Sequence, residues 1–102
     1  RDFLHISDLV SAFETIISKG VFNGGVYNIG SGVETRIKEA ADIFFGLAGN
    51  NKQPVAFNKV VRLGDPLRWQ ADIRRLSDLG FSPKLDLTTG LKQYITWLRE
   101  NA

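Results

Sequence analysis

Helical spacing of apolar residues, broken by glycine, is the feature that most constrains how this chain can fold. Apolar side chains three and four positions apart share one face of a helix, and glycine is typical of the position where a helix ends. Four helices are expected; they begin at Ser7 or Asp8, Thr35, Asp72 and Asp86, which can cap an N-terminus, and end near Gly20, Gly49, Gly80 and Leu98. The apolar positions of the first helix are Leu9, Val10, Phe13, Ile16 and Ile17.

Short β-type runs lie between these helices. Residues 1–6 form an extended opening, residues 26–29 a strand bounded by glycines, and residues 55–60 a strand that follows a restart at Gln53-Pro54. The pattern predicts one α/β domain with four helices and two or three short strands in 102 residues. So few strands make a poor sheet alone, and we expect another part of a larger protein to complete it.

The beginning of the chain also indicates a larger protein. The sequence contains no methionine and opens on Arg1-Asp2-Phe3, so we expect a truncated piece. In that case, apolar surface that the missing part normally covers should be exposed. The candidates for this face or its edge are Phe3, Ile6, Tyr27 and Ile29.

The charge balance argues against a nucleic-acid-binding protein. Thirteen basic and 11 acidic residues leave a net charge of only +2, without the concentrated basic surface that a polyanion needs. Basic residues do gather between Lys59 and Arg75, which favours a local anion site. No apolar run approaches the about 20 residues of a membrane span, so we expect no membrane partner.

Catalytic and metal chemistry is not visible in these residues. There is no cysteine, and His5 is the single histidine, which favours a structural hydrogen-bonding role over a metal or catalytic one. The turn Gly30-Ser31-Gly32 superficially resembles a dinucleotide loop, but Thr35 stands where the fingerprint needs glycine. We therefore interpret it as a plain strand-to-helix turn, and predict that this chain alone holds no cofactor, no metal and no catalytic residue.

Three stretches together resemble the extended short-chain dehydrogenase/reductase family, the NAD-dependent nucleotide-sugar epimerases and dehydratases. The first, residues 1–9, resembles the family's Arg-Asp-Phe/Tyr-Ile-His-Val-x-Asp segment, and the second, residues 26–32, its Tyr-Asn-Ile/Val-Gly-Ser/Thr-Gly turn. The third resembles the closing pattern of Arg-x-Gly-Asp, Ala-Asp and Leu-Gly-Trp-x-Pro. It consists here of Arg62-Leu63-Gly64-Asp65-Pro66, Ala71-Asp72, Leu79-Gly80-Phe81-Ser82-Pro83-Lys84 and Gly90-Leu91.

The resemblance implies that residues 1–102 are the C-terminal substrate-binding domain of a cytoplasmic, homodimeric enzyme. In this family an N-terminal Rossmann domain binds NAD or NADP and supplies a catalytic Tyr-x-x-x-Lys pair. That pair is missing here, since Ser31 follows Tyr27 at the fourth position and Leu98 follows Tyr94. The C-terminal region closes over a nucleotide-diphosphate sugar, which is transiently oxidised at a sugar carbon. The fragment alone should therefore be inactive.

Three residues match substrate-binding positions of the family. Arg1 and Arg62 match arginines that approach the substrate diphosphate, and Asp65 matches a position that contacts the nucleotide's sugar hydroxyls. Arginine suits this task because its planar guanidinium offers paired donors to phosphate oxygens. The alternatives are that each arginine is merely solvated or ion-paired, and that Asp65, which precedes Pro66, is only a turn residue.

Two other functions stay open at this point. Some members of the superfamily keep the fold but lose catalysis and act as binding or sensor proteins. A self-contained small α/β module is the third possibility. The sequence upstream of Arg1 would separate them, because a Gly-x-x-Gly-x-x-Gly turn and a Tyr-x-x-x-Lys pair would support the enzyme.

Overall fold

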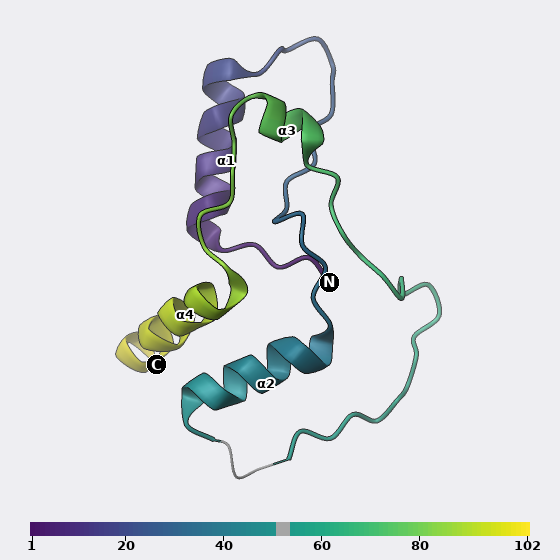
Figure 1. Ribbon diagram of the computed structural model, residues 1–102, viewed down its shortest axis with the longest axis vertical. Coiled ribbons are helices and arrows are strands. Elements are labelled where there is room, and N and C mark those ends of the chain that lie inside the picture. The colour runs from purple at the N-terminus through teal and green to yellow at the C-terminus, as the bar shows by residue number, and fades with distance from the viewer. Residues whose placement is uncertain (51–53) are drawn as a thin grey trace.

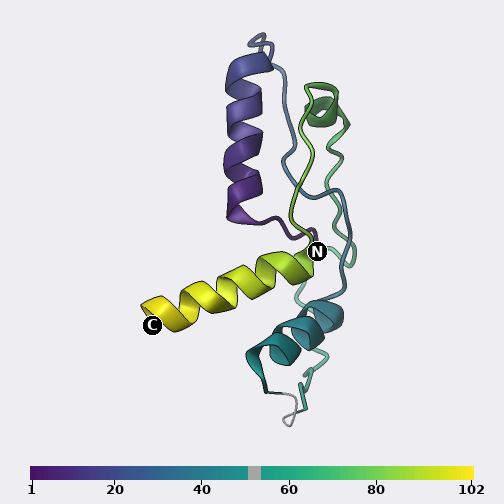
Figure 2. The ribbon, with the colours of Figure 1, turned by 60° about the vertical axis from the view of Figure 1, so that its left-hand side comes forward.

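The computed structural model describes residues 1–50 and 54–102, and over them the chain forms four helices (Figure 1). They are α1 (Ile6–Lys19), α2 (Ile37–Ala48), α3 (Arg74–Asp78) and α4 (Leu87–Asn101). Helix α1 packs beside α3, and α2 beside α4, so the molecule has two helical layers joined near the N-terminus (Figure 2). The four predicted helices are thus confirmed. The chain was predicted to become extended again at Gln53-Pro54, and Gln53 lies outside the described residues.

Three of the four predicted helix caps do not occupy the N-cap position. Helix α1 is capped by His5, whose ring nitrogen Nδ1 accepts a hydrogen bond from the backbone N–H of Ser7 at 3.2 Å. Helix α2 has Arg36 at its N-cap with no side-chain capping bond, while the expected cap, Thr35, is buried one residue earlier. The cap of α4 is correct, because the Asp86 carboxylate accepts from the backbone N–H of Thr89 at 2.7 Å.

Asp8 and Asp72, the aspartates predicted to cap α1 and α3, do not occupy the N-cap positions of these helices. Asp8 lies inside α1, is 2% exposed, and accepts hydrogen bonds from the backbone N–H groups of Lys84 and Leu85, both at 3.0 Å. It therefore ties α1 to the segment before α4. Asp72 lies one residue before the N-cap of α3; its carboxylate accepts from the backbone N–H of Arg74 at 3.1 Å and forms an ion pair with the Arg74 guanidinium at 2.6 Å. The hydrogen bond from Arg74 lowers the pKa of Asp72 to about 2.

The predicted strands are not formed by the described residues. Their β-type pairing is one isolated antiparallel bridge, between Asp2 and Glu34. Residues 26–29 have no regular secondary structure, and the backbone oxygen of Val26 accepts from the Arg75 side chain at 3.2 Å. A strand needs a partner strand to form its ladder, and an extended run that has none stays irregular. The described residues therefore form a helical fold, and the two or three strands of the predicted α/β class are not seen in them.

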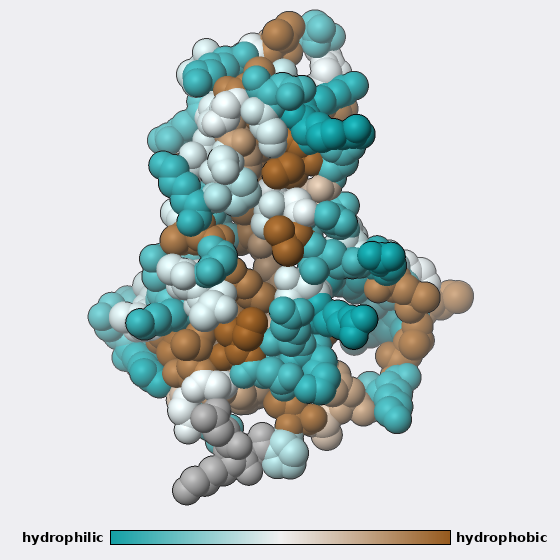
Figure 3. All heavy atoms as spheres, viewed as in Figure 1, coloured by the Kyte–Doolittle hydropathy of each residue, from teal (hydrophilic) through white to brown (hydrophobic). Residues whose placement is uncertain are grey.

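The apolar core is small for a chain of this length. Buried apolar side chains are Ala12, Leu76, Phe81 and Ile95. The radius of gyration is 16.3 Å, against about 13 Å for a compact domain of 100 residues. Because the core is small and the chain is not compact, much apolar surface faces outward, including patches seen in Figure 3 over α2 and α4. No helix over the described residues has the length and apolar character needed to cross a lipid bilayer.

One exposed apolar stripe follows the whole of α1. Its members recur at helical spacing and are more than half exposed: Ile6, Val10, Phe13 and Ile17. The opposite face of the helix is the buried one and contains Ala12. Of the residues predicted for an exposed face, Phe3 and Ile6 are exposed, whereas Tyr27 and Ile29 are half-buried. The apolar positions of α1 thus divide into a core face and an open face.

Candidate functional site

An arginine-rich cavity of about 700 Å³ lies between the beginning of α2 and residues 60–68. The space-filling view shows the molecule hollowed between its body and this segment (Figure 3). Arg1, Arg62 and Asp65, the three residues singled out from the sequence, all line it. The remaining lining residues are Glu34, Thr35, Arg36, Ile37, Val60, Val61, Pro66, Leu67 and Arg68.

Arg1 is held in place by both its backbone and its side chain. Its backbone oxygen accepts from the N–H of Thr35 at 2.8 Å. Its guanidinium donates to the backbone oxygen of Pro66 at 2.8 Å and lies 3.8 Å from the Asp65 carboxylate. The guanidinium carbon also lies 5.3 Å from the ring centre of Trp69, within the range of a cation–π contact. These contacts fix Arg1 at the cavity wall.

Asp2 fixes the backbone on which Arg1 is placed. One carboxylate oxygen accepts from the backbone N–H and the hydroxyl of Ser31, both at 2.7 Å, and the other from the N–H groups of Gly32 and Ala71, both at 3.0 Å. Burial raises the pKa of Asp2, but the hydrogen bonds from Ser31, Ala71 and Gly32 outweigh it and leave the pKa below its usual value. Asp2 therefore joins three segments behind the cavity as a carboxylate.

The same contacts decide the role of the Gly30-Ser31-Gly32 turn. A pyrophosphate would need the free backbone N–H groups of such a turn, but those of Ser31 and Gly32 already donate to Asp2. A Cβ added at Gly30 would lie 2.5 Å from the Cβ of Ala71, so glycine is needed here for close backbone packing. The turn is structural and does not fit a dinucleotide.

Arg62 and Asp65 lie at the ends of a tight turn in the cavity wall. The N–H of Asp65 donates to the backbone oxygen of Arg62 at 3.1 Å, and Gly64 has a φ of 89°, which glycine adopts without strain. Both side chains are exposed. The Arg62 guanidinium makes no hydrogen bond or ion pair with another described residue, so it is available to a ligand.

Three charged residues of the cavity were missed by the sequence reasoning. Arg68 holds Glu34 with two nitrogens: Nε lies 3.0 Å and Nη2 2.7 Å from the same carboxylate oxygen. The hydrogen bond from Arg68 lowers the pKa of Glu34. Arg36 reaches the cavity from the N-cap of α2. Arg68 lies in the basic stretch noted in the sequence, but no pattern joins it to residues 34 and 36.

The charges of this cavity suit an anion. Four arginines face two carboxylates across it, and none of the described lining residues is His, Cys, Tyr or Lys. A set of guanidinium groups binds phosphate oxygens through charge and directed hydrogen bonds. The arrangement is therefore one for binding and orienting an anionic ligand.

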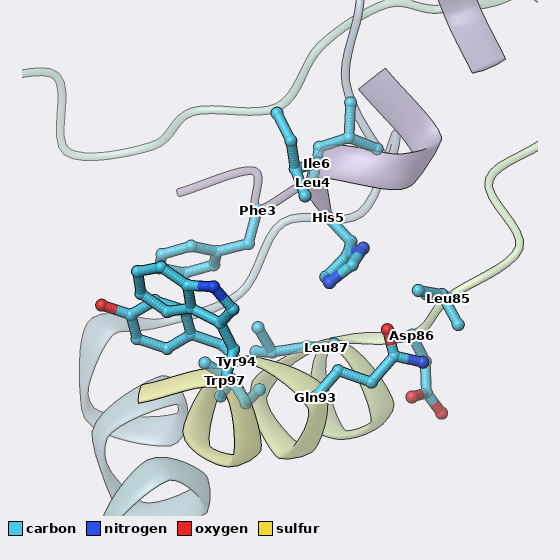
Figure 4. A pocket seen from close by; sticks show the side chains of 12 residues that line it. Phe3, Leu4, His5, Ile6, Leu85, Asp86, Leu87, Gln93, Tyr94 and Trp97 are labelled. Atoms are coloured by element: carbon cyan, nitrogen blue, oxygen red, sulfur yellow. The ribbon is translucent and has the colours of Figure 1, made fainter. Parts of the chain in front are cut away.

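A second, apolar pocket of about 600 Å³ lies between the segment before α1 and helix α4 (Figure 4). Phe3, Tyr94 and Trp97 gather at one end of it, and His5 faces it from the other side. Tyr94 and Trp97 stack with their ring centres 6.0 Å apart. The Nδ1 atom of His5 is engaged by the hydroxyl and the backbone N–H of Ser7. Apolar side chains dominate the lining of this pocket, and Arg and Lys are absent from the described residues that line it.

Comparison with known proteins gives a consistent set of relatives. No protein-family model matches the chain. It is 31% identical over 106 residues to the human dTDP-D-glucose 4,6-dehydratase and 32% identical over 102 residues to the dTDP-glucose 4,6-dehydratase of Streptomyces griseus. It is 34% identical over 103 residues to an Arabidopsis thaliana protein named as a trifunctional UDP-glucose 4,6-dehydratase, 3,5-epimerase and reductase.

Each match covers 99% of this chain. The chain spans 30% of the length of the two dTDP-glucose dehydratases and 15% of the trifunctional protein. It corresponds to the C-terminal portion of such enzymes, and the resemblance found in the sequence is confirmed. The chain is thus a homologue of the C-terminal part of nucleotide-sugar epimerases and dehydratases of the extended short-chain dehydrogenase/reductase family.

Proposed function

We propose that this chain is the substrate-binding domain of an NAD(P)-dependent nucleotide-sugar epimerase or dehydratase. The observation that carries the proposal is the cavity in which Arg1, Arg62 and Asp65 come together. A nucleotide-diphosphate sugar presents a diphosphate, which suits Arg1 and Arg62, and sugar hydroxyls, which suit the acceptor oxygens of Asp65. These residues bind and orient the substrate.

The chemistry of the reaction is proposed to reside outside this chain. NAD or NADP, bound by an N-terminal Rossmann domain, would accept a hydride from a sugar carbon and later return it. The Gly30-Ser31-Gly32 turn does not fit that cofactor, because Asp2 occupies its donors. The complete enzyme is proposed to act in the cytoplasm as a homodimer.

The substitution Arg62→Ala tests the proposed binding role. In the complete protein it should weaken binding of UDP, GDP or dTDP, whichever the wild type binds best, by roughly 10- to 150-fold, as expected for one lost charge-assisted contact. Arg62→Lys should recover only part of the affinity, because a point charge cannot replace the bidentate fork. Isothermal titration calorimetry measures both effects.

Arg74→Ala is the matched control, since Arg74 is an exposed arginine that pairs with Asp72 outside the cavity. It should bind the nucleotide like the wild type. The affinity for NAD should be unchanged in all three variants, because the cofactor is assigned to another domain. An Arg62→Ala protein with wild-type nucleotide affinity would refute the role of Arg62.

The exposed stripe of α1 is proposed to pack on the Rossmann domain. Its four members, Ile6, Val10, Phe13 and Ile17, form a continuous apolar face of the kind that marks an interaction surface. The chain of residues 1–102 by itself should therefore self-associate with rising concentration, and Phe13→Ser should weaken the association. Sedimentation velocity measures this. Val33→Ser, an exposed apolar position outside α1, should have no effect; a strictly monomeric wild type would contradict the proposal.

A further inference from the structure

The segment that carries Arg62 and Asp65 has almost no apolar anchoring. Every residue from 56 to 70, here called the strap, is exposed. Its large apolar side chains also point into solvent, with Leu63 fully exposed and Leu67 at 90%. Figure 1 shows the strap running well apart from the helices. Burial of apolar surface therefore does not determine where Arg62 and Asp65 lie.

Polar contacts near one end of the strap attach it to the rest of the described chain. Arg1 contacts Asp65 and donates to Pro66, Gln70 donates to the backbone oxygen of Gly32 at 2.6 Å, and Arg68 pairs with Glu34. Of these, the Glu34–Arg68 pair has the most complete geometry, with three nitrogen–oxygen distances of 2.7 to 3.2 Å. A bidentate ion pair of this kind fixes the orientation of the two side chains as well as the distance between them.

Glu34 is the fixed partner in this pair. Its side chain is 23% exposed, whereas that of Arg68 is 84% exposed. The backbone at Glu34 is held by the bridge to Asp2 and by the hydrogen bonds between Arg1 and Thr35. Arg68, by contrast, reaches from the strap, three residues after Asp65. The Glu34–Arg68 pair is thus one of the contacts that fix where the strap lies.

We propose that Glu34 is a positioning residue for the substrate site: by binding Arg68 it holds the strap so that Asp65 stays beside Arg1 and Arg62 lines the same cavity. The inference rests on the proposed function, since the ligand is the same nucleoside diphosphate. Arg68 acts in this arrangement through Glu34 rather than as a ligand contact.

The sign of the effect separates this role from simple electrostatics. A carboxylate that lines an anion site repels the anion, so charge alone predicts tighter binding when Glu34 loses its charge. Positioning predicts the opposite, because the freed strap no longer holds Arg62 in place. Glu34→Asp adds a second distinction: it keeps the charge but is too short to preserve the bidentate pair.

The test is calorimetric titration of the complete protein with UDP, GDP and dTDP. Glu34→Gln and Glu34→Asp should each weaken binding on the order of 3- to 10-fold, since binding depends on groups that are held in place. Arg68→Gln, on a largely exposed side chain that should not disturb folding, should weaken it similarly. The double variant Glu34→Gln/Arg68→Gln should be no worse than either single one. Glu39→Gln, an acidic residue on α2 outside the cavity, should leave affinity unchanged.

The failures of the two proposals can be told apart. If the wild type binds none of the three nucleotides, the proposed function and this inference both fall. If it binds, but Glu34→Gln binds equally well or more tightly, only the positioning role is overturned. Additive losses in the double variant would also overturn it, because they would show that Arg68 contacts the ligand independently of Glu34.

Discussion

Replacing Asp2 with asparagine should lower the free energy of unfolding by about 3–4 kcal/mol, although the two side chains have nearly the same shape. Each oxygen of the carboxylate accepts two hydrogen bonds, from Ser31 on one side and from Gly32 and Ala71 on the other. With its amide nitrogen toward Gly32 and Ala71, asparagine would leave both backbone N–H groups unpaired; with the nitrogen toward Ser31, the hydroxyl could turn to accept, but the backbone N–H of Ser31 would lose its acceptor. Urea denaturation monitored by circular dichroism measures the loss.

The exposed aspartate of α2 provides the control for this experiment. Asp42 pairs only with Lys38 four residues earlier, and its side chain is 55% exposed, so Asp42→Asn should change the stability little. A loss of similar size in both variants would show that the effect comes from net charge and not from the hydrogen bonds of Asp2.

The effect of Asp2→Asn should also depend on pH. The pKa of Asp2 is lower in the folded chain than in the unfolded one, where it has the ordinary value of an aspartate. The stabilisation is therefore fully present above the unfolded pKa and is lost as pH falls through the lower folded pKa. The difference in unfolding free energy between wild type and variant should be constant above about pH 5 and shrink in stronger acid.

Asp8→Asn should destabilise the chain by about 2–3 kcal/mol. The side chain of Asp8 is buried, so water cannot replace a hydrogen bond that the substitution removes. Its two oxygens each accept one backbone N–H, from Lys84 and from Leu85. An asparagine can satisfy only one of these, and its amide nitrogen would oppose the other. The free energy of unfolding from urea titration again gives the size of the effect.

Glu14→Gln removes a charge from the exposed side of the same helix and should be close to neutral. A neutral Asp8→Asn variant would mean that the segment of residues 84 and 85 is held to α1 by other contacts. Because Asp8 is remote from the arginine-lined cavity, nucleotide affinity should be unaffected once folding is complete.

Local patterns in the sequence were sufficient to locate the helices. A helix is built from contacts between residues three and four apart, so apolar spacing and glycines indicate where it begins and ends. The cap of α4 could be predicted for the same reason, because Asp86 accepts a hydrogen bond from Thr89, only three positions away. The pattern did not identify which apolar face of α1 is buried, because Val10 and Ile16 are both β-branched apolar residues, yet Val10 is 51% exposed and Ile16 packs against the core.

The candidate site was predicted in part, and for a different reason. Arg1, Arg62 and Asp65 were singled out by resemblance to a family, and they line one cavity although more than 60 residues separate the first from the others. Their binding role stays a prediction. Glu34 and Arg68 could not be found in this way, since their pairing across 34 residues appears in no short motif.

What the sequence determined by itself was therefore local: the four helices, the cap of α4, and short motifs that identify the family. Tertiary structure decided everything that depends on a distant partner. Residues 26–29 form no strand because no second strand of the described residues pairs with them, and Asp8 is no helix cap because its oxygens face backbone donors 76 and 77 residues away. A hydrogen-bonding group takes whichever partner the fold brings within about 3 Å, and spacing along the chain specifies that partner only when it is near.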